Sequence, residues 1–124
     1  MVTALVVEDS LTDKEIITRF LQLNGINFLT AQSAEEAFDK VKNNQFDLII
    51  LDVVLPDRSG FEICRDLKAE MGTQKIPIVI CSTKGTEMDK FWGMKQGADA
   101  YLPKPLDQEE FTKTIKQLVV PHTR

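Results

Sequence analysis

Short apolar runs alternate along the chain with segments in which apolar residues recur at helical spacing. Four such runs occupy residues 4–7, 46–53, 76–81 and 100–103, and a fifth short one occupies 28–31. Short apolar runs separated by helical patterns are typical of the buried strands of a parallel sheet. The pattern therefore predicts five strands, with a helix after each of them.

The first three helices have recognisable start and stop signals. Ser10 or Thr12 can cap the first, which Gly25 stops, and Ser33 with Glu36 forms a capping box for the second. The third runs to near Gly72. Inward-facing or helically spaced apolar residues are expected in the first helix at Ile16, Ile17, Phe20, Leu21 and Leu23, in the second at Ala34, Ala37, Phe38 and Val41, and in the third at Phe61, Ile63, Cys64, Leu67 and Met71.

The last two helices are predicted at about 87–96, stopped by Gly97, and from near Asp107, ended by Pro121. The fourth presents Met88, Phe91, Trp92 and Lys95 along one side, and the fifth turns Phe111, Ile115, Leu118 and Val119 inward. The order βαβαβαβαβα favours an α/β doubly wound parallel sheet of the flavodoxin-like type, with strand order 2-1-3-4-5.

Polar residues follow four of the predicted strands at the point where each strand ends. Glu8 and Asp9 end the first, Asp52 ends the third, Ser82 follows the fourth and Lys104 follows the fifth. The carboxyl ends of parallel strands converge on one crevice, at the switch point between strands 1 and 3. The sequence therefore predicts a site that contains three carboxylates, a hydroxyl and a lysine.

This set of residues suits phosphoryl transfer to a carboxylate. Clustered carboxylates repel one another unless a cation is present, and Mg²⁺ prefers oxygen ligands. The predicted ligands are Glu8, Asp9, Asp52 and the backbone carbonyl of Val54, with Mn²⁺ as an alternative ion. Asp52 would be the nucleophile, and Lys104 and Ser82 would contact the other phosphoryl oxygens.

Composition and charge narrow the class of protein. The 124 residues, 43% hydrophobic and 27% charged, suit one soluble domain, and the net charge of −4 gives no reason to expect a nucleic-acid partner. Neither a membrane span nor a signal peptide is visible, so a cytoplasmic protein is expected. Cys64 and Cys81 are expected to be reduced core thiols, and His122 lies too near the C-terminus to suggest a histidine-based catalyst or metal site.

The segments 7–10, 51–60, 81–83 and 101–105 resemble, in order, the landmarks of the CheY-like receiver domain of two-component response regulators. The resemblance covers essentially the whole chain as one domain, 1–124, without an output domain. It implies that Asp52 accepts a phosphoryl group from a histidine kinase or a histidine phosphotransfer protein. It also implies that Ser82 and Tyr101 form a switch pair that alters the surface for a downstream protein, and that the bond before Pro105 is cis.

Residues 82–97 resemble the single-domain receivers of type IV pilus chemosensory systems, the PilH-like group. The resemblance implies a role in twitching motility or taxis. Trp92 then has two possible interpretations: it packs within the protein, or it forms part of a surface that binds a partner.

Several alternatives remain open at this point. An aspartate-nucleophile phosphatase would need an acid two residues after Asp52, where this chain has Val54. A pseudo-receiver would have the same fold but would act as a binding module without being phosphorylated. A phosphate sink would take phosphoryl groups from a kinase that it shares with another receiver. The chain could also be the receiver domain of a larger regulator with a DNA-binding output domain. A monomer is expected, because no long apolar face is left over once the core is assigned.

Overall fold

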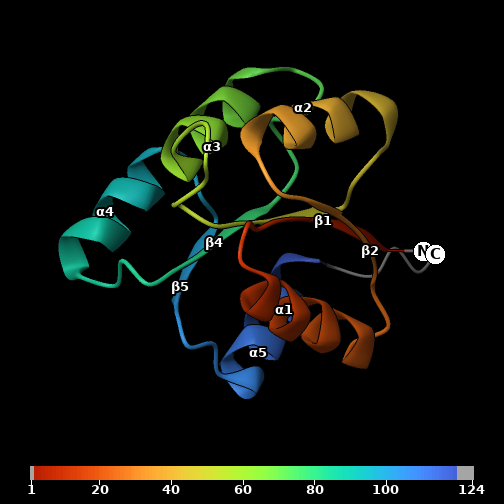
Figure 1. Cartoon of the computed structure of the whole chain (residues 1–124), viewed down its shortest axis with the longest axis vertical. Helices are drawn as coiled ribbons and strands as arrows, with labels where there is room; N and C mark the ends of the chain where they lie inside the picture. The colour runs from red at the N-terminus through yellow and green to blue at the C-terminus, as the bar shows by residue number, and fades with distance from the viewer. Residues whose placement is uncertain (1, 120–124) are drawn as a thin grey trace.

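The computed structural model describes residues 2–119 as a parallel sheet covered by helices on both faces (Figure 1). Its strands lie in the order β2-β1-β3-β4-β5, and every neighbouring pair is parallel. The predicted flavodoxin-like order is therefore confirmed. The strands are β1 Thr3–Val7, β2 Asn27–Ala31, β3 Leu48–Leu51, β4 Ile78–Ser82 and β5 Ala100–Pro103.

A helix follows each strand, and each helix begins at a polar capping residue. The caps are Ser10, Ser33, Ser59, Thr86 and Asp107, and each side chain accepts a hydrogen bond from the first turn. Gly25 and Gly97, which follow two of the helices, have φ of +70° and +105°. The helices are α1 Leu11–Leu23, α2 Ala34–Asn43, α3 Gly60–Ala69, α4 Glu87–Lys95 and α5 Gln108–Leu118.

Alternate residues of the central strands build two separate cores. On β1, Leu5 and Val7 face the core under α2 and α3, whereas Ala4 and Val6 face the core under α1 and α5. Figure 1 shows these helix pairs on opposite sides of the sheet. Because both faces are covered, the three central strands, β1, β3 and β4, appear in the sequence as continuous apolar runs.

Some predicted positions differ in the structure. Met71, expected to face inward, is 90% exposed, because α3 ends at Ala69 and Met71 lies in the turn that follows. Leu23 at the end of α1 is also exposed. The ladder of β3 is shorter than the predicted 46–53, although Phe46 and Val53 are buried on either side of it. Pro121 and His122 lie outside the described residues.

Helix α4 differs from the other helices in what it exposes. Its large apolar side chains are open to solvent, with exposed fractions of 73% for Met88, 56% for Phe91, 52% for Trp92 and 47% for Met94. The expectation that no apolar face would be left over is wrong here. Within the described residues, no helix is both long and apolar enough to cross a bilayer.

Candidate functional site

The carboxyl ends of β1, β3 and β5 meet at a cavity of about 240 Å³. All four polar residues predicted to act on phosphate or metal at the ends of these three strands line it, together with Val54. The lining residues are Glu8, Asp9, Ser10, Asp13, Asp52, Val54, Thr83 and Lys104. Residues almost a hundred positions apart are thus brought together by the order of the strands.

Asp52 directly follows β3 and is only 8% exposed. Its backbone N–H donates to the Val7 carbonyl at 3.0 Å, which ties it to the end of β1. Its Oδ1 accepts a 2.8 Å hydrogen bond from the Val53 N–H and lies 3.7 Å from the Lys104 ammonium. Oδ2 is therefore the oxygen left available to the cavity.

Lys104 is the cation of the site, and its side chain is buried beside Glu8 and Asp52, whereas its third partner, Asp13, is partly exposed. Its Nζ donates to Glu8 Oε1 at 2.7 Å and to Asp13 Oδ2 at 3.0 Å. The side chains of Lys104 and Glu8 are 7% and 1% exposed. The backbone N–H of Lys104 donates to the Ser82 carbonyl at 2.9 Å, so the lysine is also fixed to the end of β4. One ammonium is thus shared among carboxylates from three elements.

Burial and pairing act in opposite directions on this ion pair. Burial raises the pKa of Glu8 above its usual value, and the hydrogen bond from Lys104 offsets that only in part. Burial alone would lower the pKa of Lys104, but its hydrogen bonds to Glu8 and Asp13 and the negative charges of Asp52 and Glu8 together outweigh it and raise that pKa. Lys104 is therefore held in its charged form.

The oxygen atoms that line the cavity are of the kind that bind a hard divalent cation, but the carboxylates are not clustered as they would be around a bound ion. Within residues 2–119, no three His, Cys, Asp or Glu side chains are grouped closely enough to hold a metal ion as they stand. Lys104 bonds to Glu8 and lies near Asp52 instead. Asp9, Asp52 and Val54 nevertheless line one cavity, and oxygen ligands of this kind are those that Mg²⁺ prefers.

Ser82 and Tyr101 are linked through one residue of the loop that follows β4. Ser82 is fully buried, and its Oγ accepts a 3.1 Å hydrogen bond from the Lys84 N–H. The Tyr101 hydroxyl donates to the Lys84 carbonyl, and burial raises the pKa of that hydroxyl. The ring packs on the core beneath α2 and α3. The Lys104–Pro105 peptide bond is cis.

The loop after Asp52 is held by two close contacts. The start of α3 comes so near that a Cβ on Gly60 would lie 2.0 Å from the Asp52 carbonyl oxygen, which only glycine permits. Asp57 accepts hydrogen bonds from the N–H groups of Ala34 and Glu35 at 2.9 and 3.0 Å. These backbone donors lower the pKa of Asp57. The loop is therefore tied to both α3 and α2.

Sequence reasoning missed three residues at or near this site. Asp13 lines the cavity and binds Lys104, and Thr83 lines the cavity next to Ser82. Asp57 joins the loop after Asp52 to α2. The available signal for Asp13 was its place in the first turn of the helix that directly follows Glu8 and Asp9, a turn in which acids are otherwise explained by the helix dipole.

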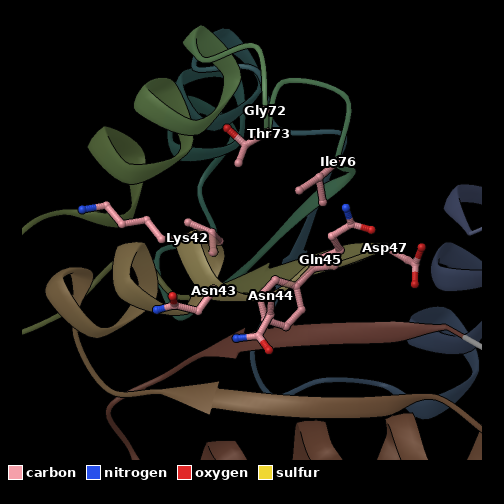
Figure 2. Close-up of a pocket in the computed structure, with 10 residues that line it drawn as sticks. Lys42, Asn43, Asn44, Gln45, Asp47, Gly72, Thr73 and Ile76 are labelled. Atoms are coloured by element: carbon pink, nitrogen blue, oxygen red, sulfur yellow. The ribbon is translucent and has the colours of Figure 1, made fainter.

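A larger cavity of about 550 Å³ lies at the other end of the sheet, between the end of α2 and the turn after α3 (Figure 2). Two of its three amides are engaged within the fold, since Asn43 and Asn44 donate to carbonyls of α2. Its one acid, Asp47, accepts a hydrogen bond from the Thr3 N–H. It therefore lacks the clustered carboxylates and buried cation of the smaller cavity.

Comparisons with known proteins identify the family to which this five-stranded parallel sheet, with an acidic cavity at its carboxyl edge, belongs. Residues 4–116 match the response regulator receiver domain family. The chain is 35% identical to Protein PilH of Pseudomonas aeruginosa over 119 residues, covering 96% of this chain and 98% of PilH. This chain belongs to the response regulator receiver domain family.

Another relative and two solved structures share the sequence pattern or the fold of this chain. It spans about half the length of the response regulator MprA of a Mycobacterium species, at 35% identity. The structure of Vibrio cholerae chemotaxis protein CheY4 matches with a TM-score of 0.87 and 30% identity over 95% of this chain and 98% of that one. The receiver domain of the sensor kinase PA1611 from Pseudomonas aeruginosa, solved with magnesium in its active-site cleft, has the same fold at 21% identity, with a TM-score of 0.87 and 96% and 98% of the two chains covered.

Proposed function

We propose that this chain is a phospho-accepting response regulator in which Asp52 takes a phosphoryl group from the phosphohistidine of a kinase or phosphotransfer protein. One observation carries the proposal. A nearly buried carboxylate stands 3.7 Å from a buried ammonium, in a cavity that is also lined by three further acids, Glu8, Asp9 and Asp13. The same arrangement provides a nucleophile, a cation for the developing charge and oxygen ligands for a metal.

The chemistry is a displacement at phosphorus. Asp52 Oδ2 attacks the phosphorus atom, a new O–P bond forms, and the P–N bond to the donor histidine breaks. The electron pair of that bond stays on the imidazole nitrogen of the donor. Asp52 Oδ1 is held by the Val53 N–H, so the carboxylate is already oriented before the donor arrives.

Lys104 and a divalent cation would together neutralise the negative charge of the carboxylates and of the phosphoryl group. Glu8, Asp9, Asp52 and the Val54 carbonyl are the proposed Mg²⁺ ligands, and the ion would neutralise charge on the transferring group. Lys104 is the second cation, and its pairing with Glu8 keeps it near Asp52. Ser82 would donate its hydroxyl to a phosphoryl oxygen after releasing the Lys84 N–H.

The output is proposed to be a protein surface that includes α4. Phosphorylation adds acceptor oxygens near Ser82, and Ser82 is joined to Tyr101 through Lys84. Trp92 lies half-exposed on α4 with Phe91, over whose ring the Lys95 ammonium sits at 5.5 Å. An exposed aromatic face of this kind is suited to a protein partner, and the phosphoryl group need only favour a state that is already populated.

The likeness to PilH supports the finer proposal that the chain acts in a chemosensory system that controls twitching motility. A phosphate sink for a shared kinase uses the same site chemistry without the α4 output. Loss of the exposed aromatic face would separate these roles. Trp92→Ala with Phe91→Ala should abolish signalling if α4 is the output, and should leave a sink unaffected.

The acceptor role is tested by incubating the protein with acetyl phosphate and Mg²⁺ and measuring its intact mass. We expect a gain of one phosphoryl group in the wild type and none in Asp52→Asn. Asp47→Asn, at the far end of β3, is the matched control and should behave as the wild type. An unmodified wild-type mass would instead support a receiver fold that works without phosphorylation.

Trp92 fluorescence offers a second measurement with beryllofluoride, which imitates a phosphoryl group on a carboxylate. The fluorescence change should be saturable, should require Mg²⁺ and should be absent from Asp52→Asn.

A further inference from the structure

Gly93 occupies a position in α4 where glycine is unfavourable for the helix itself. It lies inside the helix, where glycine destabilises relative to alanine because it loses more backbone freedom on folding. It is also the one buried residue described in α4, whose large apolar side chains are exposed. A packing reason for the missing side chain must therefore come from a neighbouring element.

That neighbour is the ring of Tyr101 on β5. A Cβ built on Gly93 would lie 2.7 Å from Tyr101 Cδ2 and 2.9 Å from Tyr101 Cε2, distances that real Cβ atoms essentially never show. It would lie 3.3 Å from the Cδ1 of Ile80, which is fully buried. The ring therefore fills the space that a side chain at position 93 would need.

The far end of the same ring reaches the loop that follows β4. The Tyr101 hydroxyl donates to the carbonyl of Lys84, and the N–H of Lys84 donates to Ser82 Oγ. One ring thus spans from the backbone of α4 at Gly93 to the residue that contacts Ser82. Gly93 does not line the acidic cavity.

We infer that Gly93 is a positioning residue whose missing side chain forms a seat for the Tyr101 ring. The seat holds the hydroxyl on the Lys84 carbonyl, and so links Ser82 to the α4 face that carries Trp92. This inference rests on the proposed function, because it assigns Gly93 to the path from Asp52 to the output surface. Phosphoryl transfer itself does not involve the seat.

A double-mutant cycle tests the seat without any phosphorylation. With Tyr101 present, Gly93→Ala should lower the urea midpoint of unfolding, because the methyl group and the ring compete for the same space. In a Tyr101→Ala background the same substitution should raise the midpoint, because the ring is gone and alanine is the better helix former. Gly72→Ala, with nothing within 4 Å of its Cβ, is the control and should show no such reversal. An equal decrease in both backgrounds overturns the inference.

Amide NMR spectra test the connection to the loop. Tyr101→Phe keeps the ring and removes only the hydroxyl that donates to Lys84. Gly93→Ala should shift the amide signals of Lys84 and Gly85 as Tyr101→Phe does, whereas Gly72→Ala should leave them in place. Unmoved signals in Gly93→Ala would show that the ring keeps its place without the seat, which overturns the inference.

The consequence for signalling is tested separately from the acceptor role. Gly93→Ala should gain a phosphoryl group from acetyl phosphate at the wild-type rate, and should lose the coupling between phosphorylation and the amide signals of α4. Full wild-type coupling in Gly93→Ala overturns the inference. A wild type that takes up no phosphoryl group overturns the proposed function instead, and the double-mutant cycle still decides whether the seat exists.

Discussion

The Lys104 ammonium and the Glu8 carboxylate form a 2.7 Å ion pair between β5 and β1, with side chains 7% and 1% exposed. Removing one partner of a buried pair is costly, because the other is left as an uncompensated buried charge. The pair therefore couples the stability of the fold to the charge state of the site.

Lys104→Met should destabilise the protein by about 3 kcal/mol near neutral pH, towards the low end of the range for breaking a buried pair, because Glu8 can protonate in response. The pKa of Glu8 is already raised by burial, and it should rise further without Lys104. A raised folded-state pKa contributes stability at low pH that is lost as pH rises through it. Urea unfolding at several pH values should therefore show the defect growing with pH. Lys42→Met, on the exposed end of α2, is the control and should change little.

Divalent cations should bind Lys104→Met more tightly than the wild type. Lys104 and the proposed Mg²⁺ compete for the same carboxylates, so removing the ammonium leaves more negative charge for the ion. We expect an increase in affinity of about tenfold, or about 1.4 kcal/mol, as a screened fraction of a full charge interaction. Titration calorimetry with Mg²⁺ provides the measurement.

Asp13→Asn should change Mg²⁺ affinity in the opposite direction. It removes one negative charge from the cavity and frees Lys104, which lies 3.0 Å from Asp13, to compete with the ion. Opposite shifts in the two variants would identify shared carboxylates as the cause. Shifts of the same sign would mean that the lysine and the ion do not compete.

The phosphorylated form of this protein is expected to have a long lifetime. Val54 lies two residues after Asp52, and Lys84 lies two residues after Ser82. Receivers that carry an amide or an acid at these two positions are expected to lose the phosphoryl group faster. Val54 lines the cavity and cannot orient an attacking water, and the exposed Lys84 could shield the phosphoryl group. Val54→Asn should shorten the lifetime, measured as the loss of phosphorylated mass after the donor is removed. A wild-type phosphoryl group that disappears within seconds contradicts this expectation.

Neither cysteine should react with thiol reagents in the folded protein. Burial raises the pKa of the Cys64 thiol to about 11 and raises that of Cys81 further. Since the thiolate is the reactive form, labelling at pH 8 should be slow until urea unfolds the chain, and both thiols should then react. Rapid labelling of either one under native conditions would show that its strand or helix opens locally.

Asp57 should contribute stability that depends on pH in the sense opposite to Glu8. Its pKa lies below the ordinary 3.8, because the N–H groups of Ala34 and Glu35 donate to it. A lowered folded-state pKa contributes stability at higher pH that is lost as pH falls through it. Asp57→Asn should therefore have a lower Tm than the wild type at pH 7, and the difference should shrink in acid. Asp39→Asn, an exposed acid on α2, controls for the change of charge on that helix.

The amino-acid sequence determined the fold and the acidic site to a large extent, because both depend on patterns among residues that are close together along the chain. Strands buried on both faces appear as apolar runs, helices as periodic stripes with polar caps, and parallel topology brings Glu8, Asp9, Asp52 and Lys104 to one edge. The same local reasoning failed at Met71, because α3 ends two residues before its apolar pattern does.

Contacts between residues far apart were decided only by the tertiary structure. The sequence places Lys104 in the site, but only the tertiary structure, which brings the first turn of α1 to the residue after β5, gives it Asp13 as a partner. From the sequence alone, Gly93 is only an unfavourable residue inside a helix. The tertiary structure explains it, because the Tyr101 ring occupies the space that a side chain at position 93 would need. The exposed face of α4 likewise depends on where the helix lies at the sheet edge. Periodicity specifies which elements form, whereas the packing of one element on another specifies which side chains meet.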